Sequence, residues 1–132
     1  MHKTKDEVNE LVMEALKNVG LERAVDLMPS ELSGGMRKRI GLARTLILKP
    51  EIMLYDEPTT GLDPITGREI SNLIVAIQEK YHTSSIIITH DMECAKIVAN
   101  RIMILIDGFK YTVGTYDELV KSDDPKIKPF FA

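Results

Sequence analysis

IMLYDEPTTGLDP, residues 52–64, is the stretch that decides the fold class of this chain. Four apolar residues run directly into two carboxylates and then into a loop that ends at Pro64. A short apolar run without alternation is typical of a strand buried in a parallel sheet. Parallel sheets bind ligands at the carboxyl ends of their strands. Asp56 and Glu57 are therefore predicted to lie at a ligand-binding edge.

The rest of the chain predicts an α/β domain with a largely parallel sheet. The apolar runs SIIIT (85–89) and IMILI (102–106) predict two further buried strands, and a DG turn then leads to a short hairpin partner at YTV. Helical spacing of apolar residues predicts helices over 6–19, 34–48, 64–81 and 92–99, with a last short helix at DELVKS. Strands that alternate with helices are the pattern of a parallel sheet.

The strand ends carry the candidate chemistry. An Asp at such an edge can hold Mg²⁺, and a neighbouring Glu can act as general base on a water that attacks phosphorus. His90, in IIITHD, could contact a γ-phosphate or orient the water. Taken alone, a DE pair is more often a solvated acidic turn and a His after a strand a surface residue. Asp63 and Asp91 are predicted helix N-caps.

The second unusual stretch is LSGGM, residues 32–36, at the start of a helix. Ser33 is a good N-cap, whereas Gly34 and Gly35 each cost about 0.5–1 kcal/mol relative to Ala in a helix. Without side chains, their N–H groups and the positive helix end stay open to an anion such as phosphate. The alternative is a tight turn between two helices.

Composition excludes several classes of protein. The 132 residues contain 44% hydrophobic and 28% charged residues, with a net charge of −3, which argues against a nucleic-acid-binding domain. The cluster 37–39, RKR, is therefore predicted to be a solvated helix face. One cysteine, Cys94, cannot form an internal disulfide, and no apolar run approaches the ~20 residues that span a bilayer.

Together these residues resemble the ATP-binding-cassette (ABC) ATPases. LSGGM is similar to the family signature, usually LSGGQ, and IMLYDE (52–57) resembles the Walker B strand with its catalytic Glu. TGLD (60–63) resembles the D-loop, and His90 in ITHD resembles the switch histidine. The order and spacing also match. The expected fold is thus a partial P-loop NTPase domain with a mostly parallel sheet and part of the helical subdomain.

The resemblance implies a role for each matching residue. Glu57 and His90 are expected to be catalytic, the first activating water and the second sensing the γ-phosphate, and Asp56 to coordinate Mg²⁺. Asp63 is expected to link two sites in a head-to-tail dimer. The set expected to bind ATP held by the other subunit is Ser33, Gly34, Gly35 and Met36. Met36 replaces the usual glutamine, which removes a side-chain amide but leaves the backbone donors unchanged.

The resemblance also implies a division of the chain. Residues 1–31 are expected to end the helical subdomain, 32–122 to hold the signature helix and a RecA-like core half that lacks Walker A, and 123–132 to form a C-terminal tail. No Gly-x-x-x-x-Gly-Lys-[Ser/Thr] occurs in the 132 residues. The chain is therefore expected to be a C-terminal half that is inactive alone. The absent strand would lie between 85–89 and 102–106, so we expect abnormal sheet closure or self-association.

The implied function is an ATP-binding and ATP-hydrolysing subunit, with ATP and Mg²⁺, that powers an ABC transporter. The wording of 32–46, 56–67 and 122–131 most resembles phospholipid-trafficking (lipid-asymmetry, Mla-type) ATPases. The implied partners are membrane permease subunits, a second ATPase subunit and a lipid-binding subunit, at the cytoplasmic face of the cell membrane, with no nucleic acid. Phe130 and Phe131 are predicted either to dock on a partner or to pack on their own domain. A soluble ABC-superfamily ATPase of DNA repair or translation and a non-catalytic regulatory fragment remain the alternatives.

Overall fold

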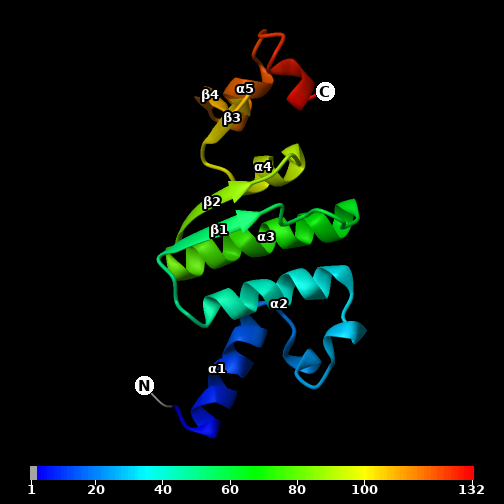
Figure 1. Ribbon diagram of the computed structural model, residues 1–132, viewed down its shortest axis with the longest axis vertical. Helices are drawn as coiled ribbons and strands as arrows, with labels where there is room; N and C mark the ends of the chain where they lie inside the picture. The colour runs from blue at the N-terminus through cyan, green and yellow to red at the C-terminus, as the bar shows by residue number, and fades with distance from the viewer. Residues whose placement is uncertain (1–2) are drawn as a thin grey trace.

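The computed structural model describes residues 3–132. Its α-helices are α1 (Lys5–Asn18), α2 (Gly34–Leu46), α3 (Pro64–Tyr81), α4 (Met92–Val98) and α5 (Tyr116–Val120), with 3-10 turns at Glu22–Ala24, Pro29–Glu31 and Lys128–Phe130. Its strands are β1 (Ile52–Asp56), β2 (Ser84–Ile88), β3 (Ile102–Ile106) and β4 (Phe109–Gly114). These elements form an elongated stack that runs from α1, α2 and α3 through β1 and β2 to α4 and then to the hairpin β3–β4 (Figure 1). Each of these predicted helices and strands is present, with ends that differ by at most two residues.

Capping side chains explain where the helices begin. Thr4 accepts a hydrogen bond from the backbone N–H of Glu7, whose carboxylate accepts from the N–H of Thr4, so a capping box starts α1. Asp63 accepts from the N–H groups of the first turn of α3, directly before Pro64. The prediction that Asp63 and Asp91 are N-caps is confirmed.

Strands β1 and β2 pair in parallel, with Asp56 opposite Ile88 at the carboxyl end. Because side chains alternate along a strand, one face of this pair turns Met53 and Tyr55 toward the helices. There Met53 joins a core with α1, α2 and α3, and Tyr55 packs against a second core made by α3 and α4. The predicted α/β class is confirmed.

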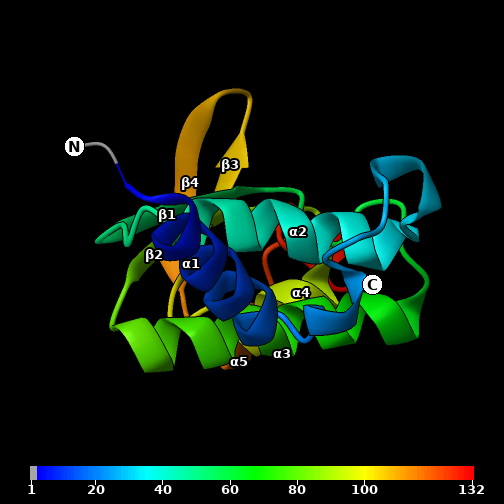
Figure 2. The ribbon, with the colours of Figure 1, turned by 90° about the horizontal axis from the view of Figure 1, so that it is seen from below.

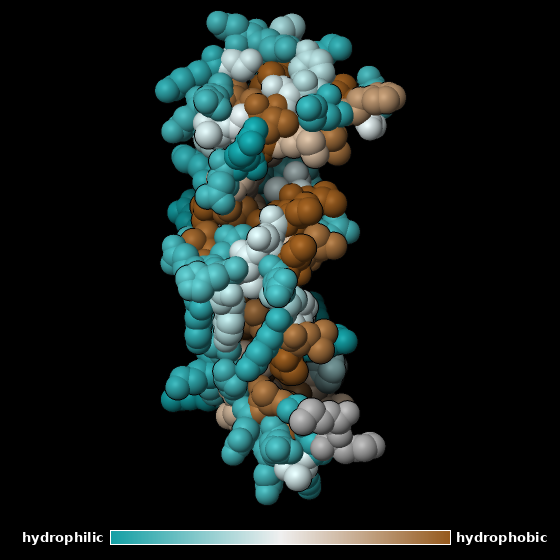
Figure 3. Space-filling model, turned by 90° about the vertical axis from the view of Figure 1, so that its left-hand side faces the viewer, coloured by the Kyte–Doolittle hydropathy of each residue, from teal (hydrophilic) through white to brown (hydrophobic). Residues whose placement is uncertain are grey.

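The other face of the β1–β2 pair is bare. Leu54 is 75% exposed and its register partner Ile86 is 62% exposed, with Ile52 and Ile88 similarly uncovered. Hydrophobic side chains gather across the middle of the molecule, at the height of these strands (Figure 3). The prediction that these strands are fully buried is wrong for the described residues, because only one face has helices packed on it.

The second sheet is separate from the first. β3 and β4 pair antiparallel around a turn at Asp107 and Gly108, both with positive φ, as hairpin turns of this kind require. The hairpin projects to one side of the helical layers (Figure 2). β2 and β3 do not pair, and a groove of about 430 Å³ separates them. Within residues 3–132, β2 and β3 have therefore not closed into one sheet. Of the two expected outcomes, abnormal closure and self-association, the second is still to be tested.

The C-terminal residues pack on their own module. Phe131 lies against the small core of Ile104, Leu119 and Ile127, and its ring forms a T-shaped pair with that of Tyr116, with 5.4 Å between the ring centroids. This confirms the packing alternative for Phe131, whereas Phe130 is 41% exposed and borders the groove between β2 and β3. No helix within residues 3–132 is long and apolar enough to cross a bilayer.

The bare face and unpaired edges predict that the 132-residue chain self-associates. Light scattering at increasing concentration is expected to show a mass above that of the monomer, since exposed edges and apolar faces pair with one another. Leu54→Lys together with Ile86→Lys is expected to restore the monomer mass, whereas Asn72→Lys, on an exposed position of α3, leaves the association in place. A monomer at every concentration would contradict this expectation.

Candidate functional site

The carboxyl ends of β1 and β2 bring the two predicted catalytic residues together. The N–H of Glu57 donates to the carbonyl of Ile88 at 2.8 Å, which extends the parallel pairing by one step. Glu57 Oε1 then lies 2.8 Å from His90 Nδ1. The hydroxyls of Thr60 and Thr89 donate to Glu57 Oε2 at 3.1 and 3.4 Å. The prediction that Glu57 and His90 share one site agrees with this geometry.

The backbone at Glu57 is unusual. Its φ of 47° lies in the left-handed region, which costs a non-glycine residue roughly 1–3 kcal/mol and often marks functional sites. The ammonium of Lys38 on α2 donates to the Glu57 carbonyl at 3.1 Å and so ties the strained turn to that helix. The predicted solvated face at 37–39 is wrong for Lys38 and also for Arg39, which bonds the Val19 carbonyl and Glu69.

Charge and hydrogen bonding fix the protonation of the pair. The hydrogen bond to His90, helped by the hydroxyl of Thr60, lowers the pKa of Glu57 below 4.5. The same bond and the negative charges of Glu57 and Asp91 raise the pKa of His90 above 6.5. At neutral pH, Glu57 is therefore a carboxylate that can accept a proton, and His90 holds its proton more tightly than a free imidazole does.

Asp56 ends β1 beside this pair with an exposed carboxylate. Among residues 3–132 its carboxylate makes no hydrogen bond, and it borders a cavity of about 220 Å³ that Lys38 and Thr45 also line. No group of three or more acidic, His or Cys side chains in the described part of the chain could hold a metal by itself. A nucleotide-bound Mg²⁺ takes only one or two protein carboxylates, so a single free Asp56 fits that ion.

The signature residues lie at the start of α2, where it meets the loop after β1 and the start of α3. Ser33 caps α2 by accepting from the N–H of Met36 at 3.2 Å. No hydrogen bond within residues 3–132 uses the N–H of Gly34 or Gly35. Gly35 is nevertheless buried, and a Cβ there would lie 2.7 Å from Thr66 Cγ2. The sequence left two explanations for the glycines, N–H groups open to an anion and a tight turn between helices. Gly35 fits both, because its N–H is unbonded within residues 3–132 and its missing side chain lets α2 lie close to α3.

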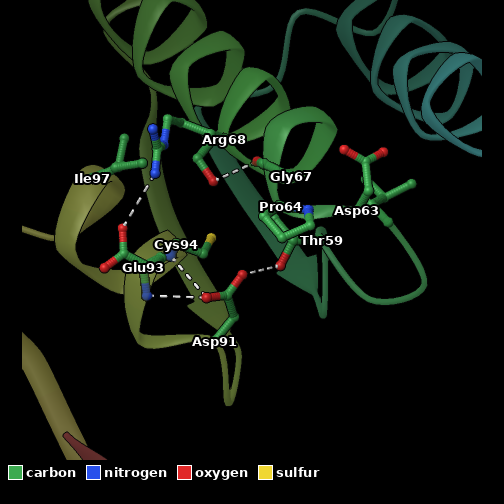
Figure 4. Close-up of a pocket in the computed structure, with 11 residues that line it drawn as sticks. Thr59, Asp63, Pro64, Gly67, Arg68, Asp91, Glu93, Cys94 and Ile97 are labelled. Carbon is green, nitrogen blue, oxygen red and sulfur yellow. Dashed lines mark hydrogen bonds and ion pairs between the residues drawn. The ribbon is translucent and has the colours of Figure 1, made fainter.

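Asp63 and Met36 flank this junction. Asp63 Oδ1 accepts from the N–H groups of Ile65 and Thr66, and these bonds with the Thr66 hydroxyl lower its pKa. Its carboxylate points away from Thr59 and Asp91 (Figure 4). Met36 lines a pocket with residues 20–24 and Leu27. No hydrogen bond of the described residues joins Ser33, Gly34 or Gly35 to the Glu57–His90 pair.

Comparison with known proteins identifies the family. The model of the family described as "ABC transporter" matches residues 2–60. A probable amino-acid import ATP-binding protein of Bacillus subtilis, YxeO, is 44% identical over 95% of this chain. The chain belongs to the ABC transporter ATPase family. The resemblance predicted from its motifs is thereby confirmed.

Other ABC ATPases match equally widely. The intermembrane phospholipid transport ATP-binding protein MlaF of Haemophilus influenzae is 38% identical over 98% of this chain. The solved structure of cbiO1 from Clostridium perfringens, part of an ABC transporter complex, superposes with a TM-score of 0.82 at 33% identity over 89% of this chain. The chain spans 49% of YxeO, 49% of MlaF and 47% of the cbiO1 chain, about half of each relative.

Sequence reasoning missed the residues that support the site. Lys38, Thr59, Thr60 and Thr89 all bond to Glu57 or to its neighbourhood. The two threonines of PTTGLD and the threonine of ITHD flank the predicted catalytic residues, and this adjacency was the available signal. Lys38 carried no such signal, because its reach to Glu57 depends on how α2 packs.

The close contact at Gly35 predicts a contrast between two glycines of α2. Gly35→Ala is expected to lower the free energy of unfolding by about 1–3 kcal/mol, because Thr66 is held by its bond to Asp63 and cannot move aside. Among the described residues, a Cβ on Gly41 would have no atom within 4 Å, so Gly41→Ala is expected to raise the free energy of unfolding by about 0.5–1 kcal/mol. Urea denaturation measures both, and equal effects would refute the packing role of Gly35.

Proposed function

We propose that this chain is the part of an ABC transporter ATPase that holds the catalytic carboxylate and the switch histidine for ATP hydrolysis. The observation that carries the proposal is the 2.8 Å contact between Glu57 and His90 at the ends of two parallel strands. Phosphoryl-transfer sites need a positioned base beside a group that contacts the phosphate, and this pair supplies both. The ligands of the site would be ATP and Mg²⁺.

Each residue then has a defined task. Glu57 is ionised at neutral pH and accepts a proton from the attacking water. His90 keeps its proton because Glu57 lies beside it, and donates it toward a γ-phosphate oxygen. Asp56 is the carboxylate that would hold Mg²⁺, an ion that neutralises charge on the phosphates when bound. Lys38, Thr60 and Thr89 hold Glu57 in its strained conformation.

The second half of the site would come from another copy. Ser33, Gly34 and Gly35 make no hydrogen bond to the Glu57–His90 pair in their own chain, and the N–H groups of both glycines are unbonded within residues 3–132. Donors at a helix N-terminus suit the γ-phosphate of ATP held by a partner ATPase subunit, with Met36 beside them. Asp63, at the same junction, would link the two sites of such a dimer.

The transported molecule is proposed to be a phospholipid. The support is the resemblance in wording noted above and the 38% identity to MlaF. Relatives named for amino acids, ribonucleotides and glycine betaine match at 39–44% identity, so the class of substrate needs its own test. The partners would be permease subunits and a lipid-binding subunit, with the ATPase at the inner face of the membrane.

The relatives named for amino acids, ribonucleotides, glycine betaine and phospholipids are all ATP-binding proteins of transport systems. This favours transport over DNA repair or translation as the function of this chain. A non-catalytic regulatory fragment is the second candidate function. The free carboxylate of Asp56 and the Glu57–His90 contact argue against it, since a regulatory module has no need of either.

Turnover of the native protein, purified as its gene encodes it and with its partners, tests the catalytic proposal. Glu57→Gln is expected to lower kcat by about 100-fold or more while ATP stays bound, because the amide cannot accept the proton. Glu79→Gln, on an exposed position of α3, is the matched control and is expected to keep the wild-type rate. Wild-type turnover in Glu57→Gln would remove Glu57 from this role.

The same preparation tests the substrate. ATPase activity is expected to rise in vesicles that contain phospholipid substrate and to be unchanged by amino acids, ribonucleotides or glycine betaine. Stimulation by one of these small molecules, without stimulation by phospholipid, would replace the phospholipid proposal and leave the catalytic one intact.

A further inference from the structure

Two loops meet at the carboxyl edge of the β1–β2 pair. Glu57 opens the loop after β1, and His90 lies in the loop between β2 and α4. Beside the backbone bond from Glu57 to Ile88, three side-chain contacts cross between these loops. They are Glu57–His90 at 2.8 Å, Thr89 to Glu57 at 3.4 Å, and the hydroxyl of Thr59 to Asp91 Oδ2 at 2.7 Å. The last of these involves neither catalytic candidate.

Exposure separates these contacts. The side chain of His90 is 80% exposed and that of Glu57 31%, whereas Thr59 is only 6% exposed. Ion pairs between solvent-exposed groups hold their geometry weakly, because water and salt compete for both partners. The hydrogen bond that a buried hydroxyl donates to a carboxylate is short and charge-assisted. The Glu57–His90 pair therefore depends on something else to keep its two loops in place.

Both ends of the Thr59–Asp91 bond are anchored. Asp91 Oδ1 accepts from the N–H groups of Glu93 and Cys94 and so is fixed to the start of α4. Thr59 lies over the bare backbone of α3, where its Cβ is 3.6 Å from the position that a Cβ on Gly67 would occupy. The close-up shows Thr59 between α3 and the Asp91 cap (Figure 4). The bond thus joins the rigid α3–α4 unit to the loop after β1.

The bond is also close to the pair along the chain. Thr59 is two residues after Glu57, and Asp91 directly follows His90. Two residues span at most about 7 Å of chain, so a fixed Thr59 limits where Glu57 can lie. Burial would raise the pKa of Asp91, but the bonds from Thr59, Cys94 and Glu93 outweigh it, and Asp91 stays a charged acceptor.

We propose that Thr59 is a positioning residue whose hydroxyl, bonded to Asp91, holds Glu57 and His90 within contact of each other. The proposal rests on the proposed function only for its use in catalysis. The geometry itself can be tested without nucleotide. Thr59 touches neither the water nor the phosphate in this account and acts through the two loops.

The titration of His90, followed by NMR in the full 132-residue chain at dilutions where light scattering gives the monomer mass, tests the proposal. Among residues 3–132, the two charged groups that face His90 are Glu57 and Asp91, and both retain their charges in the Thr59 variants. Thr59→Val keeps the side-chain volume and removes the donor, so the His90 midpoint is expected to fall from its raised value toward 6.5. Thr59→Ser keeps the hydroxyl and is expected to restore the raised midpoint.

Ser71→Ala is the matched control, because Ser71 is buried on α3 and lines a pocket with Thr59 and Asp91, but its hydroxyl donates to the Gly67 carbonyl within α3 and not to Asp91. It is expected to leave the His90 midpoint at the wild-type value. If Thr59→Val fails to fold, Asp91→Ser, which retains a capping hydroxyl, is expected to increase the motion of the His90 ring in ¹³C relaxation. An unchanged midpoint in folded Thr59→Val, or an unchanged ring in Asp91→Ser, would overturn the proposal. Neither result would bear on whether Glu57 is the base, which the turnover assay tests separately.

Discussion

The parallel pairing of β1 with β2 is the interaction on which the candidate site depends. With Asp56 opposite Ile88, the next residue, Glu57, bonds to the end of β2 and meets His90. A shift of the register by one residue would turn every side chain of one strand to the other face and separate the pair. The cores under Met53 and Tyr55 fix that register, because they bury only the residues that now face the helices. Packing on one face of a two-stranded sheet therefore determines the geometry of the chemistry at its edge.

Within residues 3–132, the β1–β2 pair also has an uncovered face and an unpaired edge. Parallel strands are normally covered on both faces, yet Leu54 and Ile86 are bare, and β2 and β3 face each other across a groove without pairing. YxeO and MlaF are each about twice the length of this chain. The Glu57–His90 contact needs only the β1–β2 pairing and the turn at Glu57, whose carbonyl accepts a hydrogen bond from Lys38 of α2. This is why the Glu57–His90 contact forms although half of the sheet surface has no partner.

Much of this arrangement could be predicted from the sequence, and the reasons for success and failure are physical. Some features depend only on neighbouring residues and not on tertiary packing, and these could be predicted. They are the strand runs, the DG turn, and the caps at Ser33, Asp63 and Asp91. The proximity of Glu57 to His90 followed from a general property of parallel sheets. The reach of Lys38 to the Glu57 carbonyl and the contact of Gly35 with Thr66 did not follow, because both depend on how α2 packs against its neighbours. Likewise, an apolar run predicts a buried strand but does not tell whether both of its faces are covered.

A titration of the Glu57 carboxyl group by ¹³C NMR is the most direct test of the account, since the central claim is that two strand ends hold this carboxylate against His90. The hydrogen bond from His90 favours the ionised form, so its midpoint is expected below the ordinary 4.5. In His90→Gln the midpoint is expected to rise toward 4.5, because the positive partner is lost. A midpoint at or above 4.5 in the wild-type chain, unaffected by His90→Gln, would contradict the account.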